Sequence, residues 1–156
     1  EGLGSVLDYH KYTIENGPRH CLQSSPMVTR GAEAETGAVR KGKRALYYWF
    51  YPNFMFNWYE GVMDTNLVYP RGVNQTEVIF DFWFADVSEA AREFNRASID
   101  IANRVQAEDE GICRSVQRGL HSRAYDTGRL SVRREAGEQL FHQLLHADLR
   151  SGAQPG

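Results

Sequence analysis

Apolar or small residues recur at steps of three and four positions in the segment that follows Ser88. The residues at these steps are Phe94, Ser98, Ile101, Val105, Ile112, Val116 and Gly119. This spacing is typical of the buried face of an α-helix. Ser88 suits the N-cap position, and Glu89 and Glu93 suit the positive end of the helix dipole. The pattern therefore predicts one long helix that begins near Ser88 and carries an apolar stripe.

Asp109 interrupts this stripe. It follows Val105 by four positions and precedes Ile112 by three, which predicts an inward-facing side chain. An unpaired buried carboxylate costs roughly several kcal/mol, so such a residue normally has a cation or a cluster of donors beside it. The residues alone favour a structural ion pair, with Arg104 or Arg129 as the cation, over a metal site.

Three segments upstream of the helix are rich in aromatic and β-branched residues: 45–59, 61–69 and 76–85. Turn-forming residues separate them, which predicts antiparallel strands joined by tight turns. We also expect an edge strand at 9–14 and an exposed loop at 31–43, where almost no apolar residue occurs. Strands that precede helices indicate an α+β fold.

The segment 47–59 divides by parity into two faces of different chemistry. The even-numbered face is wholly apolar: Tyr48, Phe50, Pro52, Phe54, Phe56 and Trp58. The odd-numbered face mixes aromatic residues with amides: Tyr47, Trp49, Tyr51, Asn53, Met55, Asn57 and Tyr59. Ligand pockets combine apolar walls with a few polar groups, so we expect the odd face to line a pocket. The alternative is a packed core face whose amides bond to neighbouring backbone groups.

Composition places the chain among ordinary globular proteins. It has 156 residues, of which 42% are hydrophobic and 24% charged, enough for one domain with a sizeable core. The formal net charge is −2, and basic residues cluster only at 40–44, a segment that we expect to be solvated at a strand entrance. The charge pattern argues against nucleic-acid binding, and the lack of a long apolar run argues against a membrane span. By default we expect a cytoplasmic location.

His142 and His146 lie four positions apart on a predicted C-terminal helix, which is the spacing of helical zinc sites. The leucines and Phe141 define the buried face of that helix, so both histidines lie on its flank. No third ligand has a recognisable spacing, and we expect solvated or packed histidines. Cys113 lies one turn from Asp109, and we expect a buried structural thiol there.

Two sets of motifs lie on either side of position 88. The downstream set is Val105-Gln106-Ala107-Glu108-Asp109-Glu110-Gly111-Ile112-Cys113, Val116-Gln117-Arg118-Gly119-Leu120, Tyr125, Gly128-Arg129, Glu135 and Phe141-His142. The upstream set is Tyr51-Pro52-Asn53, Asn57, Tyr59 and Met63-Asp64-Thr65-Asn66. Together the two sets resemble the catalytic domain of the alpha subunit of Rieske-type non-haem iron oxygenases, the aromatic-ring-hydroxylating family. The likeness covers nearly the whole chain and is greatest to the branch that oxidises choline, carnitine and glycine betaine.

The resemblance implies a helix-grip fold, in which a curved antiparallel sheet surrounds a long C-terminal helix. Residues 1–156 would then form a single, partial catalytic domain. Asp109, followed by Gln117, matches the carboxylate of the family's two-histidine, one-carboxylate iron site, and Glu108 takes this place if the register slips by one. The family's substrate-binding positions map onto four residues: Tyr47, Trp49, Asn57 and Val105. No residue is assigned a catalytic acid or base role.

The chain also departs from the family pattern. A Rieske [2Fe-2S] cluster needs a Cys-x-His and a Cys-x-x-His pair, whereas the only cysteines are Cys21 and Cys113, outside any such pair. The family's two iron histidines precede a segment that resembles 2–9 here. With one of three ligands, this chain is expected to bind Fe(II) weakly or not at all, without a [2Fe-2S] cluster, although the intact enzyme uses both.

These observations favour an oxidoreductase fragment, a mono- or dioxygenase catalytic domain that is inactive alone. Its ancestral reaction would hydroxylate or demethylate a small quaternary amine or aromatic substrate with O2. The resemblance also implies a homotrimer and a reductase partner for the intact enzyme. The alternatives are a non-catalytic module that binds a small ligand, by fold analogy, and a structural subunit.

Overall fold

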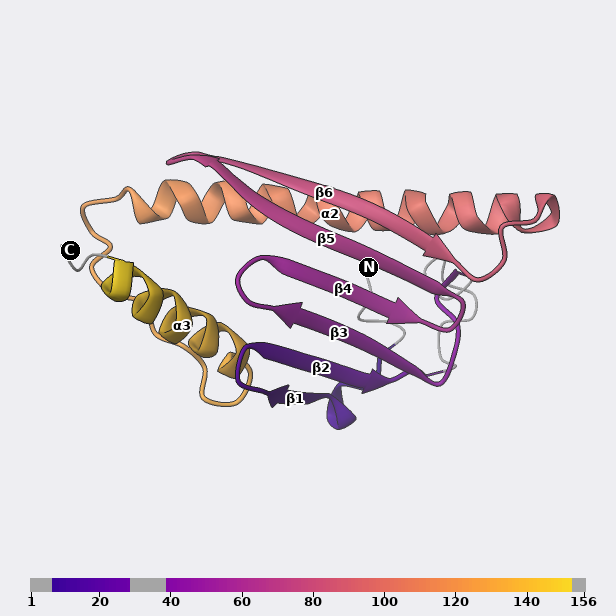
Figure 1. Cartoon of the computed structure of the whole chain (residues 1–156), viewed down its shortest axis with the longest axis horizontal. Helices are drawn as coiled ribbons and strands as arrows, with labels where there is room; N and C mark the ends of the chain where they lie inside the picture. Colours follow the sequence, from indigo (N-terminus) through magenta and orange to yellow (C-terminus); the bar gives the residue numbers. More distant parts are fainter. Residues whose placement is uncertain (1–6, 29–38, 153–156) are drawn as a thin grey trace.

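The computed structural model describes residues 7–28 and 39–152. Its elements are η2 (Tyr9–Lys11), β1 (Thr13–Asn16), β2 (His20–Pro26), β3 (Arg44–Phe50), β4 (Phe54–Tyr59), β5 (Val62–Gly72), β6 (Gln75–Phe84), η3 (Glu89–Ala91), α2 (Arg92–Leu120) and α3 (Ala136–Gly152). The strands form one antiparallel sheet in chain order, and the two long helices follow them (Figure 1). The predicted α+β class is confirmed.

The segment predicted as one strand at 45–59 is a hairpin. A turn at 51–53 separates β3 from β4, and the two strands pair with Phe50 opposite Phe54. Each pair joins residues of the same parity, as in Tyr47 with Asn57, so residues of one parity still share a face after the chain turns back. The prediction of two chemically distinct faces is therefore confirmed, although the strand boundaries were wrong.

The N-terminal part of the sheet differs from the prediction. The segment 9–14 begins with the short helix η2, and only β1 adds an edge strand. Strand β2 was not predicted, because its sequence lacks a regular alternation of apolar and polar residues. It lies between β1 and β3, where Ser24 and Ser25 are buried despite their hydroxyl groups. Position in the sheet, not local pattern, makes this segment a strand.

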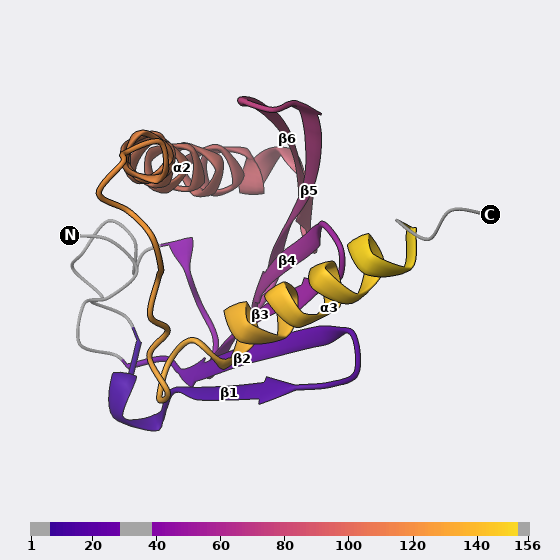
Figure 2. The same ribbon diagram turned by 90° about the vertical axis from the view of Figure 1, so that its left-hand side faces the viewer.

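Helix α2 lies on one side of the sheet (Figures 1 and 2). It follows η3, and the Ser88 side chain forms no capping hydrogen bond. The apolar stripe is buried in the N-terminal half, at Ser98 and Ile101, but exposed in the C-terminal half, where Ile112 is 62% exposed. The predicted stripe thus faces the protein interior only in the first half of the helix.

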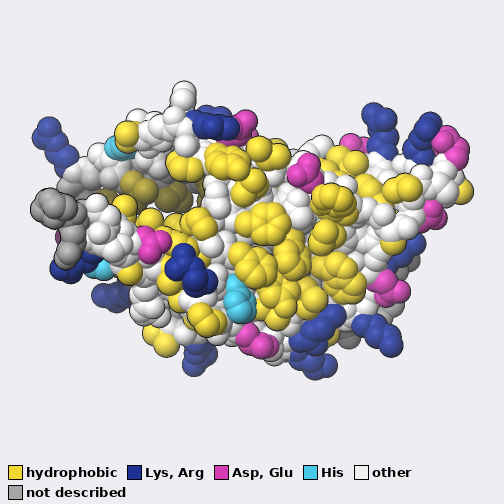
Figure 3. Space-filling model, in the orientation of Figure 1, with side chains coloured by type: hydrophobic (Ala, Val, Ile, Leu, Met, Phe, Trp, Pro, Cys, Tyr) yellow, Lys and Arg dark blue, Asp and Glu magenta, His cyan; other side chains and the backbone are white. Residues whose placement is uncertain are grey.

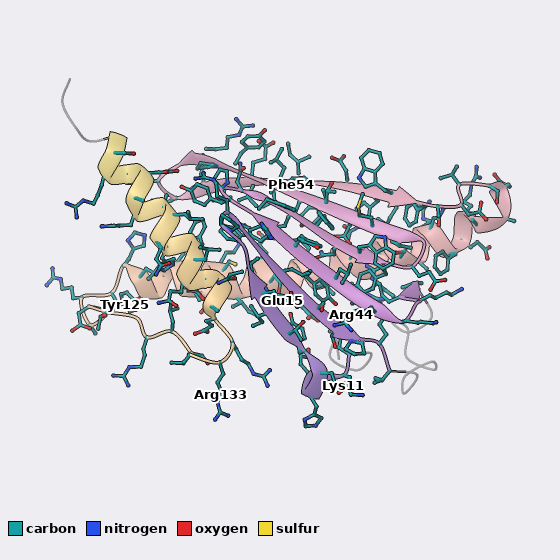
Figure 4. All side chains as sticks on the ribbon, turned by 60° about the horizontal axis from the view of Figure 1, so that its bottom comes forward. Lys11, Glu15, Arg44, Phe54, Tyr125 and Arg133 are labelled. Carbon is teal, nitrogen blue, oxygen red and sulfur yellow. The ribbon has the colours of Figure 1, made fainter. Side chains whose placement is uncertain are left out.

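Helix α3 crosses the end of the sheet that holds the β1–β2 and β3–β4 turns (Figure 2). Phe141 packs edge-on against Trp49 with ring centroids 5.6 Å apart. Tyr51 Oη donates a hydrogen bond to Asp148 Oδ2 (2.8 Å). Gly137 permits this approach, because a Cβ there would lie 2.7 Å from Cys21 Sγ. The connection from α2, which carries Tyr125 and Arg133 in Figure 4, contains no regular helix or strand.

Alternation along the paired strands defines two faces of the sheet. The inner face, toward the helices, carries Cys21, Gln23, Tyr47, Trp49, Met55, Asn57, Tyr59, Asp64, Asn66, Phe80 and Phe82. The outer face carries Leu22, Leu46, Tyr48, Phe50, Phe54, Phe56, Trp58, Met63, Thr65, Leu67, Ile79, Asp81 and Trp83. A small core cluster of Leu7, Ala45 and Tyr59 lies at one end. None of the described helices is long and apolar enough to cross a membrane.

Candidate functional site

The strand register brings polar and aromatic side chains into one row across the inner face. Tyr47 lies opposite Gln23 on one side and Asn57 on the other, and Asn57 in turn lies opposite Asp64. Phe82 completes the row on β6. Side chains opposite one another in an antiparallel pair lie about 5 Å apart at their Cβ atoms, so these groups are neighbours. Two predicted substrate-binding residues, Tyr47 and Asn57, therefore lie side by side.

Asp64 is the most unusual member of this row, because it is a carboxylate that is only 4% exposed. Its Oδ1 accepts hydrogen bonds from Asn57 Nδ2 (2.8 Å) and Asn66 Nδ2 (3.4 Å). Burial raises the pKa of Asp64, and the two amides and the nearby Arg40 charge oppose that effect. The sequence therefore places a poorly solvated acidic group in the middle of a strand, where a packed core favours an apolar side chain.

Two phenol groups adjoin Asp64 on the inner face. The hydroxyls of Tyr47 and Tyr59 share a hydrogen bond of 3.0 Å, and the two rings pack edge to face. Burial raises the pKa of both side chains, so both remain neutral phenols at physiological pH. This pair contributes aromatic surface without negative charge.

Arg40 connects this face of the sheet to helix α2. Its guanidinium lies 4.8 Å from the centroid of the Tyr59 ring, and its Nη1 donates to Ser98 Oγ. The side chain is only 5% exposed, and among the described residues no acceptor reaches its Nε. The expectation that 40–44 is solvated is therefore wrong at Arg40, although Lys41 remains exposed while its amino group lies over the Phe94 ring.

Trp49 occupies the next row of the inner face, opposite Cys21 and Met55. Its ring also contacts that of Tyr51, with centroids 6.2 Å apart. Phe141 from α3 packs against both rings. An aromatic wall thus stands directly beside the polar row, on the same face.

The predicted iron ligand Asp109 lies apart from this cluster. Its side chain is exposed, like that of Glu108, and it has no ion-pair or hydrogen-bond partner among the residues that the structure describes. The prediction of a buried carboxylate is therefore wrong, because the stripe is exposed along the C-terminal half of α2, at Ile112, Val116 and Leu120. Val105, one turn earlier, is half-buried. Gln117 Nε2 lies 3.2 Å from His121 Nε2.

The described residues do not fit a complete iron site. Residues 7–28 and 39–152 contain no group of three or more His, Cys, Asp or Glu side chains that could hold a metal. His142 instead lies 3.9 Å from Glu138 on the surface of α3. The Cys113 thiol is exposed, which corrects the expectation of a buried one, whereas Cys21 is buried and burial raises the pKa of its thiol.

Sequence reasoning did not select Asp64, Asn66 and Arg40 as site residues. Asp64 and Asn66 lie two positions apart in one strand, so their polar side chains lie on the same face. That spacing, read together with the amide of Asn57, was the available signal. Arg40 carried no comparable signal, because only the tertiary structure turns it inward.

Comparisons with known proteins agree with this fold. The family described as ring hydroxylating alpha subunit (catalytic domain) matches residues 18–151. A chloroplastic choline monooxygenase from Arabidopsis thaliana is 44% identical over 150 residues, which cover 96% of this chain and 35% of the relative. The Beta vulgaris choline monooxygenase is 32% identical over 144 residues, which cover 92% of this chain and 32% of the relative. The chain thus spans about a third of the length of these relatives.

Solved structures show the same architecture. The inhibitor complex of the quaternary ammonium Rieske monooxygenase CntA superposes with a TM-score of 0.76 at 22% identity, covering 94% of this chain and 40% of that one. A second structure of such a monooxygenase is described in terms of carnitine oxidation by gut microbiota and inter-subunit electron transfer. It superposes with a TM-score of 0.76 at 21% identity, covering 96% of this chain and 41% of that one. The fold and the family match agree: this chain belongs to the ring hydroxylating alpha subunit (catalytic domain) family.

Proposed function

We propose that this chain is part of the catalytic domain of a monooxygenase that oxidises a small quaternary amine with O2, and that the inner face of the sheet holds the substrate. The observation that carries this proposal is the row of Tyr47, Asn57 and Asp64, with the Trp49 ring beside it. The names of the relatives, choline monooxygenase and quaternary ammonium Rieske monooxygenase, support the substrate class.

The chemistry of a quaternary ammonium group suits this face. Its nitrogen can neither donate nor accept a hydrogen bond, so a protein recognises it through aromatic ring faces and negative charge. Trp49 and Tyr47 supply rings, and Asp64 supplies a carboxylate with little competing solvent. Each ring in such a contact contributes roughly 0.5–2 kcal/mol. In this proposal these residues bind and orient the cation, and they shield it from water.

Titration calorimetry with choline and its neutral isostere 3,3-dimethylbutan-1-ol tests the binding role. The two molecules have nearly the same shape and differ in the charge of the head group. We expect choline to bind at least tenfold more tightly, which corresponds to about 1.4 kcal/mol. Equal affinity for the two ligands, or binding of neither, would contradict the proposal.

For the metal, we propose that Asp109 is the one carboxylate that this chain contributes to an Fe(II) site of the intact enzyme. Its place in the motif that ends at Gln117 supports this role, but a lone exposed carboxylate binds Fe(II) weakly. The other ligands and the [2Fe-2S] cluster would then come from outside the described residues. When bound, iron supplies the oxygen chemistry of the family.

It follows that the chain alone does not oxidise substrate. With reductase, added Fe(II) and choline, oxygen consumption is expected to equal that of a protein-free control. Sustained turnover by this polypeptide would show that it contains a complete site. A homotrimer, a reductase partner and a cytoplasmic location also remain predictions for the intact enzyme, and the plant relatives carry the word chloroplastic in their names.

A second candidate function is ligand binding without redox chemistry. Asp109 lies on the exposed half of α2 with no second candidate ligand beside it among the described residues, and this position favours binding without redox chemistry. Choline binding that persists unchanged after treatment with a chelator fits both functions. Oxidation by the protein when a complete oxygenase supplies the missing groups would exclude this second candidate.

A further inference from the structure

We propose that Asp64 is a positioning residue, which holds the Asn57 amide so that its carbonyl oxygen accepts a hydrogen bond from a hydroxyl group of the substrate. This inference rests on the proposed function and deepens it. It specifies the substrate class as a quaternary amine that carries a hydroxyl donor near its cationic head. An amine without such a donor would bind the same rings but leave the Asn57 oxygen without a partner.

The chemistry of the Asn57–Asp64 contact determines the orientation of the Asn57 amide. An ionised carboxylate has only acceptor oxygens, whereas an amide has one donor end and one acceptor end. Because Asp64 Oδ1 lies 2.8 Å from Asn57, the NH2 end of that amide must face the carboxylate. Asp64 therefore determines which way the amide is turned. An Asn at position 64 would accept either orientation.

Burial and two amide donors hold the Asp64 carboxylate in place. Asp64 is only 4% exposed, and Asn66, two residues along the same strand, donates to the same Oδ1. Asp64 also lies opposite Asn57 in the strand pairing, so the backbone fixes the spacing of the two side chains. A buried acceptor held in this way gives its partner a single orientation.

The carbonyl end of the Asn57 amide has no protein donor among the described residues. With its NH2 group on Asp64, Asn57 Oδ1 is directed away from that carboxylate, and no described residue donates a hydrogen bond to it. The nearest phenol in the row, Tyr47, shares its hydroxyl with Tyr59. Asn57 is only half-buried, so its oxygen remains available on the inner face beside the aromatic rings.

Two ligands separate this role from general binding. Choline and ethyltrimethylammonium share the trimethylammonium head and the two-carbon arm, and only choline has the hydroxyl. The wild-type protein is expected to bind choline about three- to tenfold more tightly, the effect of one net hydrogen bond. In Asp64→Asn the ratio of the two affinities should fall to about one, even if both affinities change.

The matched control is Asp81→Asn, which removes the same charge from the exposed outer face of the neighbouring strand. It should leave the ratio unchanged. Asn57→Ala provides a second test that keeps Asp64, and it too should bring the ratio to about one. A purely structural role of Asp64 would weaken both ligands equally and keep their ratio.

Calorimetry of the four proteins with both ligands gives outcomes that are easy to distinguish. If wild type binds neither ligand, the proposed function fails, and this inference fails with it. If wild type binds both equally, or if Asp64→Asn and Asn57→Ala keep the preference for choline, only this inference fails. Near-ultraviolet circular dichroism shows whether each variant is folded. If Asp64→Asn is unfolded, Asp64→Ser takes its place, because a hydroxyl can donate or accept and so leaves the Asn57 amide free to turn.

Discussion

The outer face of the sheet exposes apolar side chains, whereas the inner face buries polar ones. The outer face is mainly apolar, yet Phe54 is 37% exposed and Trp58 38%. Hydrophobic side chains gather across this face in Figure 3. On the inner face Asp64 and Asn66 are buried although they are polar. Solvent exposure therefore does not follow hydrophobicity here, and each face departs from the usual arrangement in its own way.

The difference separates a face that stabilises the fold by packing from the face to which we assign ligand binding. Aromatic rings on the outer face stack on one another, as Tyr48 does on Phe56 at 4.8 Å, and need no polar partner. A buried carboxylate costs free energy unless it is compensated, so its presence on the inner face points to a binding role. Packing on the outer face stabilises the fold, whereas the buried polar groups of the inner face lower its stability.

The two faces should differ most in the stability that is lost when Tyr59 or Trp58 is truncated. These adjacent residues point to opposite faces. Tyr59→Ala removes a ring that is 1% exposed and carries the Tyr47 hydrogen bond, and we expect a loss of about 3–5 kcal/mol. Trp58→Ala, on the outer face, should cost about 1–2 kcal/mol. Urea unfolding measures both. A larger loss for Trp58→Ala would reverse the assignment of the faces.

A smaller effect is expected where α3 meets the inner face. Gly137→Ala places a methyl group against Cys21 Sγ and should cost about 1–3 kcal/mol. Gly111→Ala, in the exposed half of α2, meets no atom and should raise stability by up to about 1 kcal/mol. Thermal unfolding of the two variants compares them directly. Equal effects would mean that α3 does not pack closely on β2.

The pH dependence of stability reports on Asp64. Its folded pKa is raised, so the folded protein binds the proton more tightly than the unfolded chain. Stability should therefore fall as the pH rises from the ordinary Asp pKa to the raised folded value, and stay level above it. Asp64→Asn removes the pH dependence that Asp64 causes. The variant should be more stable than wild type at pH 7, and the difference in stability should shrink toward pH 4. Asp81→Asn, on the exposed outer face, should keep the wild-type profile.

The smallest effect is expected at Asp109. Its side chain is exposed and unpaired among the described residues, so Asp109→Asn should change the free energy of unfolding by less than about 0.5 kcal/mol. Urea unfolding at neutral pH is the measurement. A loss of about 3 kcal/mol or more would indicate a buried ion pair and would remove the case for an iron ligand.

The sequence predicted those features that depend on local periodicity. The helical steps before Ile101 and the parity of Tyr47 and Asn57 were sufficient to place a helix and two sheet faces. Strand β2 and the inward turn of Arg40 depend on tertiary neighbours, and no local pattern indicated them. The periodicity also predicted a buried Asp109, but a stripe is buried only where another element covers it.

The three tryptophans allow a direct test of ligand binding at the inner face. Trp49 lies on the inner face, whereas Trp58 and Trp83 lie on the outer face. In a Trp58→Phe/Trp83→Phe protein, choline should change the Trp49 fluorescence with a saturable dependence on concentration. In a Trp49→Phe protein it should leave the emission unchanged. A saturable change confined to the outer tryptophans would contradict ligand binding at the inner face.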